Sequence, residues 1–189
     1  LKTICGLLKP KSGRIFLNGE DITFDSVVER VKRGLVYTPE GRKLFPKMTV
    51  MENLEMGAYT CPREFKRNLE MVFALFPILK ERHNQKAGSL SGGEQQMLAV
   101  GRTLMSGPQV ILFDEPSTGL APVVVKQLAS AITQLNQQGK TIVLVEQNVH
   151  VAFQICSKAY VLENGRIVLQ GDCSLLRQDP KVKQAYLGA

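Results

Sequence analysis

Two short segments, thirteen residues apart, constrain this chain more than any other feature. The first, Leu90-Ser91-Gly92-Gly93-Glu94-Gln95-Gln96, places a serine and two glycines where a helix would begin. The second, Val110-Ile111-Leu112-Phe113-Asp114-Glu115-Pro116, is an apolar run that ends in two adjacent carboxylates. Helix N-termini attract phosphate, and carboxylates at a strand end hold magnesium or activate water. Together the segments predict a site for a nucleoside triphosphate and its metal ion.

Three short apolar runs without polar alternation predict buried parallel strands at 34–38, 110–113 and 141–145. Polar residues follow each run. In open α/β sheets, ligands bind beyond the carboxyl ends of the strands. We therefore expect the three strands to bring polar side chains to one edge of a mostly parallel sheet; these are Pro39-Glu40, Asp114-Glu115 and Glu146-Gln147.

Helical patterns separate the strands, and Asn164-Gly165 is a strong signal for a two-residue hairpin turn. The stretch 59–88 combines many charged residues with apolar residues at helical spacing, as in a surface helical insertion with a solvated face. Residues 1–8 are typical of the end of a helix. The predicted helices are 26–33, 49–57, 91–105, 121–138, 174–177 and 180–187, with one further helix starting at 149 and running to 160 before a strand at 161–162 and another at 167–169.

Composition excludes several classes of protein. The chain has 189 residues, 44% of them hydrophobic and 22% charged, which suits one globular core. No apolar run reaches the roughly 18 residues that cross a bilayer. The net charge of +7 is spread without an arginine-rich run or interleaved aromatics, so we expect no nucleic-acid partner. The four cysteines lack metal-ligand spacing and indicate reduced thiols.

The two opening segments resemble the signature and Walker B motifs of the ABC-transporter ATPases. Four further segments resemble one branch of that family, the smaller ATP-binding subunit of branched-chain amino acid importers. They are Pro39-Glu40-Gly41-Arg42, Leu44-Phe45-Pro46, Gly119-Leu120-Ala121-Pro122 and Val145-Glu146-Gln147-Asn148. The resemblance covers nearly the whole chain. It implies an α/β, P-loop-NTPase-like fold with flanking helices, divided into ATPase core (1–58), helical subdomain with the signature motif (59–106) and ATPase core with C-terminal helices (107–189).

The resemblance also implies the cofactors, ATP and Mg²⁺, and the residues that serve them. Ser91, Gly92, Gly93 and Glu94 would contact the ATP held by the opposite subunit of a dimer. Glycines suit this task because no side chain keeps the backbone N–H groups from the phosphate. Ser117 and Gly119 lie in the D-loop that crosses the dimer interface, where Ala121 replaces the usual aspartate.

The remaining site residues are implied in the same way. Asp114 would bind Mg²⁺, and Glu115 would act as the general base that orients the attacking water. Two positions depart from the commonest pattern: Glu40 replaces the Q-loop glutamine and is a further candidate for Mg²⁺, and Gln147 replaces the switch histidine. A glutamine amide can donate a hydrogen bond to phosphate, but unlike histidine it cannot take up a proton or carry a charge.

One expected part is absent, because no G-x-x-x-x-G-K-[ST] loop occurs in the 189 residues. That loop and the strand before it would lie at the centre of the sheet in the family, just upstream of Leu1-Lys2-Thr3. We therefore expect this chain alone to bind and hydrolyse ATP poorly. We also expect unpaired strand edges and exposed apolar residues where the strand would pack.

The resemblance implies partners too: a second ABC ATPase subunit, as homodimer or heterodimer, membrane permease subunits and, indirectly, a solute-binding protein outside the membrane. The chain would then lie peripherally at the cytoplasmic face of the cell membrane. Two alternatives stay open. In one, the chain is a catalytically degenerate donor of the signature motif in an asymmetric dimer. In the other, it is a soluble ABC ATPase of translation or DNA repair, although it shows neither tandem cassettes nor long coiled-coil insertions.

Overall fold

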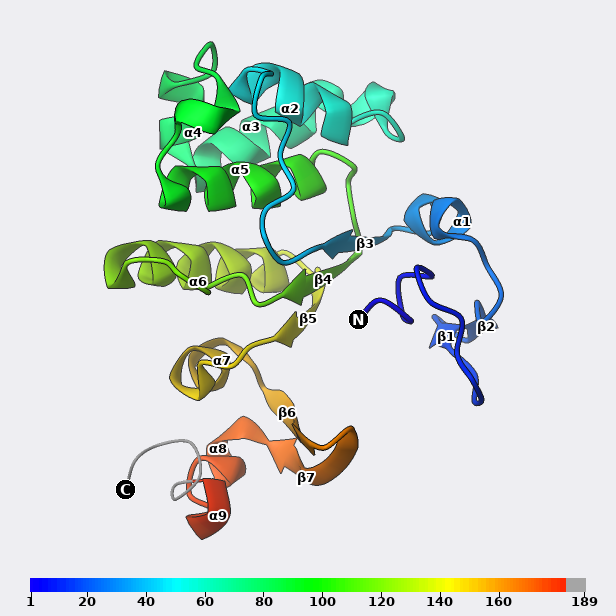
Figure 1. Ribbon diagram of the computed structural model, residues 1–189. Coiled ribbons are helices and arrows are strands. Elements are labelled where there is room, and N and C mark those ends of the chain that lie inside the picture. The colour runs from blue at the N-terminus through cyan, green and yellow to red at the C-terminus, as the bar shows by residue number, and fades with distance from the viewer. Residues whose placement is uncertain (183–189) are drawn as a thin grey trace.

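A three-stranded parallel sheet forms the centre of the computed structural model, which describes residues 1–182 (Figure 1). Its strands are β3 (Leu35–Thr38), β4 (Val110–Asp114) and β5 (Thr141–Val145), in the order β3-β4-β5. The register pairs Thr38 with Phe113 and Asp114 with Val145, so all three strands end at one edge. The predicted α/β fold with a parallel sheet is confirmed.

Alternation along the strands separates two apolar clusters. Ile111 and Phe113 of β4 belong to the larger cluster, which includes most of the buried helical residues. Leu35 of β3 and Leu112 of β4 point into a smaller cluster with Cys5 and Ile22 of the N-terminal segment. Strands buried on both faces explain why the sequence shows continuous apolar runs rather than alternation.

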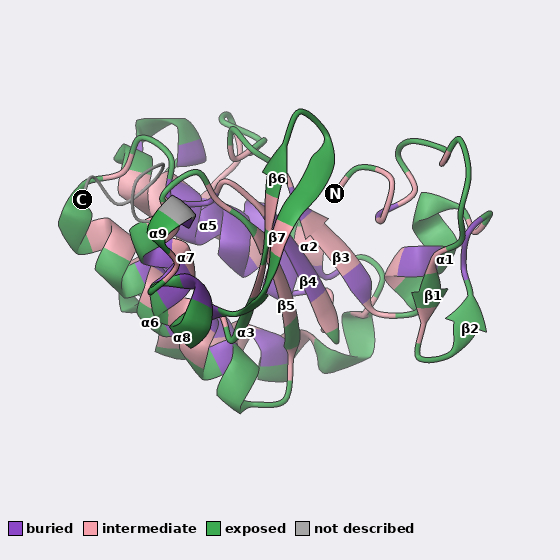
Figure 2. Ribbon diagram, turned by 90° about the horizontal axis from the view of Figure 1, so that it is seen from below, coloured by how far each residue is buried: buried purple, intermediate pink, exposed green. Residues whose placement is uncertain are grey.

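The larger cluster is covered by helices. The helix α5 (Gly92–Leu104) contacts β3, and α6 (Pro122–Gln137) contacts β5. Figure 1 shows α2 to α5 gathered as one group beside the sheet. Figure 2 shows many buried residues in α5 and β4. The other helices of that group are α2 (Val50–Gly57), α3 (Phe65–Leu75) and α4 (Pro77–Glu81), with the 3₁₀ turns η1 (Pro62–Glu64) and η2 (Ala87–Ser89). The helical character predicted for 59–88 is therefore confirmed.

Three helices begin with the same reciprocal cap. Ser26 caps α1 (Val27–Lys32), Thr49 caps α2 and Ser91 caps α5, each with a glutamate three residues later that returns a hydrogen bond. This capping box satisfies N–H groups that the first helical turn leaves free. The hydrogen bonds fix where each helix starts, in agreement with the sequence.

Some local predictions were wrong. The helix expected at 149–160 is shorter, because α7 (Val149–Ile155) ends before β6 (Lys158–Glu163). Residues 1–8 form hydrogen-bonded turns rather than the end of a helix. A small hairpin of β1 (Phe16–Leu17) and β2 (Glu20–Asp21) was missed, although the turn residues Asn18-Gly19 signal it.

The C-terminal part consists of the predicted hairpin, whose second strand is β7 (Arg166–Asp172), and two short helices. The helices are α8 (Cys173–Leu176) and α9 (Pro180–Val182). Part of the helix expected at 180–187 lies outside the described residues. The three-part division of the chain at 58 and 106 stays a prediction.

Strand edges and apolar side chains are exposed around this sheet. Within residues 1–182, β5 pairs only with β4, and β6 pairs only with β7. Apolar side chains are exposed near both edges, including Val145 on β5 and Tyr160, Leu162 and Ile167 on the hairpin, which is mostly exposed in Figure 2. This agrees with the expected unpaired edges. Among the described helices, none has the length and apolarity needed to span a membrane.

Candidate functional site

Asp114 ends β4 and Glu115 directly follows it, at the carboxyl edge of the sheet. Glu115 has a left-handed backbone with φ of +48°, a conformation that costs a non-glycine residue about 1–3 kcal/mol. Its Oε1 accepts a hydrogen bond from Gln147 Nε2 at 2.7 Å, and its Oε2 accepts one from Thr118 Oγ1 at 3.2 Å. The predicted base and the predicted switch residue are therefore in direct contact.

Asp114 has a different partner. Tyr37 of β3 donates its hydroxyl hydrogen to Asp114 Oδ2 at 2.6 Å. Burial and the neighbouring carboxylate raise the pKa of Tyr37 well above its usual range, so the hydroxyl keeps its proton. One carboxylate oxygen of Asp114 is thus held by a neutral donor on the adjacent strand.

Glu146 binds the segment that follows the two carboxylates. Its Oε1 accepts a hydrogen bond from the backbone N–H of Ser117 at 2.9 Å, and its Oε2 accepts one from Ser117 Oγ at 2.8 Å. Ser117 is buried, and Gly119 has a φ of +70° in the exposed turn beyond it. The segment that follows Glu115 is therefore hydrogen-bonded to the residue directly after β5.

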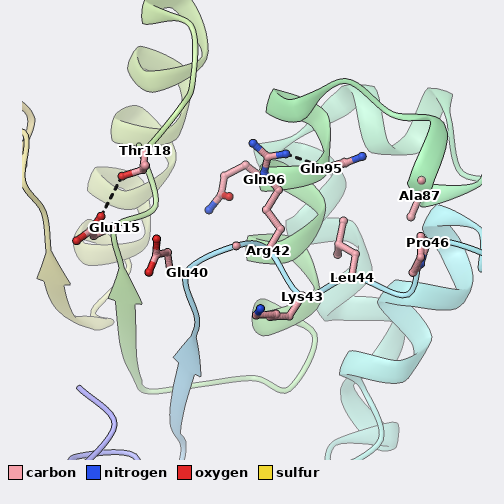
Figure 3. Close-up of a pocket in the computed structure, with 12 residues that line it drawn as sticks. Glu40, Arg42, Lys43, Leu44, Pro46, Ala87, Gln95, Gln96, Glu115 and Thr118 are labelled. Carbon is pink, nitrogen blue, oxygen red and sulfur yellow. Dashed lines mark hydrogen bonds between the residues drawn. The ribbon is translucent and has the colours of Figure 1, made fainter.

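A cavity of about 350 Å³ opens beside Glu115. Glu40, Gln95, Gln96 and Thr118 line it together with Glu115, and Figure 3 shows the amide of Gln96 directed into it from α5. The loop after β3 contributes most of the remaining wall, with residues 41–43 all in left-handed backbone conformations. Glu40 and Glu115 thus face the same cavity, as the common-edge argument predicted.

The signature segment forms the start of α5. Ser91 is its N-cap, and Glu94 completes the capping box by accepting a hydrogen bond from the Ser91 N–H at 2.8 Å. Glu94 also forms an ion pair with Arg82 at 3.2 Å. A side chain at Gly93 would meet Val124 of α6 at 2.8 Å, and Gly92 is exposed. The first turn of α5 therefore has room for glycine alone at Gly93, and Gly92 leaves its backbone open to solvent.

The structure separates these residues into two groups. Within residues 1–182, no hydrogen bond or ion pair links Ser91, Gly92 or Gly93 to the carboxylates at the end of β4. This separation suits a signature segment that acts on a ligand held elsewhere. Asp114, Glu115, Gln147 and Glu40 lie at or just beyond the carboxyl ends of the three parallel strands.

The donor set fits magnesium in a restricted way. The described part of the chain contains no cluster of three or more metal-ligating side chains. Mg²⁺ is usually held by one or two carboxylates, with water and substrate phosphates completing its shell. Asp114 offers one carboxylate whose Oδ2 is already held by Tyr37. A nucleotide-bound Mg²⁺ therefore fits this edge better than a metal held by protein alone.

A second concavity, of about 410 Å³, lies between the loop after β3 and the helices α2 and α5. Exposed Phe45, Met56 and Tyr59 contribute its apolar wall, and Arg102 lies 5.4 Å from the Phe45 ring centroid. Burial lowers the pKa of Arg102. Arginine and lysine line this groove, but no aspartate or glutamate among the described residues does.

Three contributors to the site escaped the sequence reasoning: Tyr37, Glu146 as the partner of Ser117, and Thr118. Glu146 directly follows β5, so the rule that polar residues after parallel strands meet at one edge already pointed to it. Tyr37 carried no such signal, because an aromatic residue inside a strand is ordinary core composition. Its role depends on the register of β3 against β4.

Comparisons with known proteins find similar sequences along the whole chain. The sequence model of the ABC transporter family matches residues 1–118. The chain is 46% identical over 189 residues to the high-affinity branched-chain amino acid transport ATP-binding protein BraG of Pseudomonas aeruginosa, covering all of this chain and 81% of that protein. It is 38% identical over 190 residues to the probable branched-chain amino acid transport ATP-binding protein LivF of Archaeoglobus fulgidus, covering all of this chain and 80% of that protein.

Solved structures show the same fold. An ATP-binding cassette of an ABC transporter in its ADP conformation superposes with a TM-score of 0.80 at 28% identity, covering 100% of this chain and 82% of that one. A dimeric cassette in a post-hydrolysis state, bound to ADP and phosphate, gives a TM-score of 0.77 at 26% identity, covering 91% of this chain and 78% of that one.

Proposed function

The chain belongs to the ABC transporter family, and we propose that it is the ATP-hydrolysing subunit that powers import of branched-chain amino acids through a membrane permease. The observation that carries the hydrolytic role is the hydrogen-bonded edge of the sheet, and the likeness to BraG and LivF supports the solute class. There Glu115 is held between Gln147 and Thr118, next to Asp114. This is the arrangement needed to place one carboxylate against water and another against a metal-bound nucleotide.

The residues at this edge divide the chemical work. When bound, ATP with Mg²⁺ supplies the phosphoryl group and neutralises its charge. Asp114 would hold the metal, with Glu40 as a second candidate ligand. Glu115 would accept a hydrogen bond from the attacking water and take its proton, while Gln147 donates its amide hydrogen toward the reaction centre. Since the Gln147 amide cannot accept a proton from water, Glu115 is the only base proposed for this step.

The first turn of α5 would act on the nucleotide of a second ATPase subunit. Ser91 offers a hydroxyl, and Gly92 and Gly93 offer backbone N–H groups at a helix N-terminus. Glu94 keeps Ser91 in place through the capping box, and Ser117 and Gly119 would lie at the subunit interface. Closing of such a dimer around ATP, and its opening after hydrolysis, would drive the permease.

The permease would dock into the groove formed by Phe45, Met56, Tyr59 and Arg102. Its apolar wall suits a short helix from the membrane subunit. Its positive charge, with no lining carboxylate among the described residues, suits an acidic side chain on that helix. Such docking would hold the chain peripherally at the cytoplasmic face of the membrane, with a solute-binding protein acting on the far side.

The 189-residue chain by itself would hydrolyse ATP poorly. It contains no G-x-x-x-x-G-K-[ST] loop, so backbone donors and a lysine for the β- and γ-phosphates are missing from these residues. Magnesium-dependent turnover by this chain alone, abolished by Glu115→Gln, would contradict that expectation. A role confined to donating the signature motif is the alternative, and the intact Glu115 geometry argues against it.

Uptake by membrane vesicles tests the function. Vesicles that contain the permease, this subunit and its partner ATPase subunit, with the solute-binding protein added outside, should accumulate labelled leucine, isoleucine and valine when the ATPase subunits face the lumen and ATP is enclosed there. The Glu115→Gln variant should abolish uptake, and the matched Glu70→Gln variant, on the exposed side of α3, should not. Uptake of another solute class, with no competition by leucine, would overturn the proposed substrate.

A further inference from the structure

Glu146 lies at the site, but the proposed function gives this residue no role. It lies directly after β5, and both of its carboxylate oxygens accept hydrogen bonds from Ser117, at 2.9 Å from the backbone nitrogen and 2.8 Å from Oγ. Hydrogen bonds to a charged acceptor are stronger than neutral ones. Ser117 is buried, so its two donors have little access to water as a substitute partner.

The neighbours of this pair hold Glu115 from both sides. Gln147 follows Glu146 in the chain and donates to Glu115 Oε1, while Thr118 follows Ser117 and donates to Glu115 Oε2. The backbone N–H of Glu115 also donates to the Val145 carbonyl at 2.9 Å. Hydrogen bonds thus join the segments 115–118 and 145–147 in a closed ring. The contact between Glu146 and Ser117 is the part of this ring that does not involve Glu115 itself.

The strained backbone of Glu115 depends on the hydrogen bonds between Ser117 and Glu146. Glu115 has a φ of +48°, a backbone conformation that residues other than glycine rarely adopt. It persists only when surrounding contacts enforce it. The hydrogen bonds from Ser117 to Glu146 fix the chain two residues after Glu115. Without them, the turn would be free to relax toward ordinary backbone angles and move the Glu115 carboxylate.

We propose that Glu146 is a positioning residue: by binding Ser117 it holds the catalytic carboxylate of Glu115 at the orientation needed for hydrolysis. The proposal rests on the proposed function of Glu115. It assigns Glu146 no contact with ATP or metal. Because Ser117 lies in the segment proposed to reach the dimer interface, the same pair would also connect that interface to the base.

The test compares Glu146→Ala, Glu146→Gln and Ser117→Ala in the assembled transporter, with Glu70→Ala as a matched control on the surface of α3. Glutamine preserves the geometry, since its amide oxygen accepts from the Ser117 N–H and its amide nitrogen donates to Ser117 Oγ. Steady-state ATP hydrolysis gives kcat and KM, and thermal unfolding reports the fold of each variant. Ser117→Ala supplies the measurement if Glu146→Ala does not fold.

We expect kcat to fall roughly 10- to 100-fold for Glu146→Ala, with KM for ATP unchanged. Misplacing a catalytic group lowers the reaction rate by factors of that size. Glu146→Gln should recover most of the rate, and Ser117→Ala should fall between them. Native kcat in both Glu146→Ala and Ser117→Ala would overturn the proposal, as would a lower unfolding temperature with kcat unaltered. If Glu115→Gln itself hydrolyses ATP normally, the proposed function fails; if Glu115→Gln is inactive and Glu146→Ala is not impaired, only this inference fails.

Discussion

The hydroxyl of Tyr37 donates a hydrogen bond of 2.6 Å to Oδ2 of Asp114 across two neighbouring parallel strands. Tyr37 is paired in register with Leu112, two residues before Asp114, so the tyrosine ring reaches toward the carboxyl end of β4. For Asp114, the proposed Mg²⁺ ligand, such a donor would fix the orientation of the carboxylate and leave its other oxygen for the metal. Tyr37 thereby connects the strand before Glu40 to the strand that ends in the two carboxylates.

Replacing Tyr37 by phenylalanine should weaken the response to Mg²⁺. The ring stays in the smaller apolar cluster, so the fold should be kept. The hydrogen bond to Asp114 is lost, so the orientation of that carboxylate is no longer fixed. We expect the Mg²⁺ concentration for half-maximal ATP hydrolysis in the assembled transporter to rise by about tenfold, the lower end of losses for such partners. Tyr160→Phe on the exposed hairpin is the control. An unchanged Mg²⁺ dependence in Tyr37→Phe would show that Asp114 needs no such support.

The same contact predicts an alkaline titration. Burial and Asp114 raise the pKa of Tyr37, so its phenol should ionise at higher pH than the ordinary value of about 10. A group whose pKa is higher in the folded state than in the unfolded state stabilises the fold fully at pH values below its unfolded-state pKa. That contribution is lost as the pH rises through its folded-state pKa. Absorbance at the phenolate band, taken as the difference between native chain and Tyr37→Phe, measures it. A difference that titrates near pH 10 would contradict the prediction.

Phe45→Ala should separate ATP hydrolysis from transport. Phe45 is half-exposed in the proposed docking groove and does not line the cavity beside Glu115, so hydrolysis should persist while its coupling to uptake is reduced. The measured quantity is the number of ATP molecules hydrolysed per amino acid imported, which should rise. Phe24→Ala, which removes a more exposed ring outside the groove, is the matched control. Equal coupling in both variants would place the permease elsewhere.

Gly57→Ala should destabilise the group of helices around this groove. A methyl group at Gly57 would stand 2.1 Å from the backbone oxygen of Arg102, so α2 and α5 would have to move apart. Overpacking of this kind costs typically about 1–3 kcal/mol. Urea unfolding measures the change, with Glu55→Ala on the exposed side of α2 expected to stay within roughly 0.5 kcal/mol of the native chain. Native stability in Gly57→Ala would mean that the two helices separate freely.

The sequence predicted the parts of the fold that depend on local chemistry. Ser91 and Glu94 mark the start of α5 because both cap hydrogen bonds involve residues three apart. The common edge for Glu40, Glu115 and Gln147 followed from the behaviour of parallel strands. By contrast, Tyr37 meets Asp114 only through strand register, and Glu146 meets Ser117 although the two residues are 29 positions apart in the chain. Such long-range pairs leave no periodic signal in the sequence, so the structure was needed to find them.

The most direct test of this account is ATP hydrolysis by the assembled transporter carrying Glu115→Gln in this subunit. Loss of a general base lowers a rate by about 10²- to 10⁴-fold, and we expect a fall of at least 100-fold with ATP still bound. The control Glu70→Gln removes one exposed carboxylate of α3 and should keep the native rate. Native hydrolysis by Glu115→Gln would contradict the catalytic role of this chain and would leave donation of the signature motif as its function.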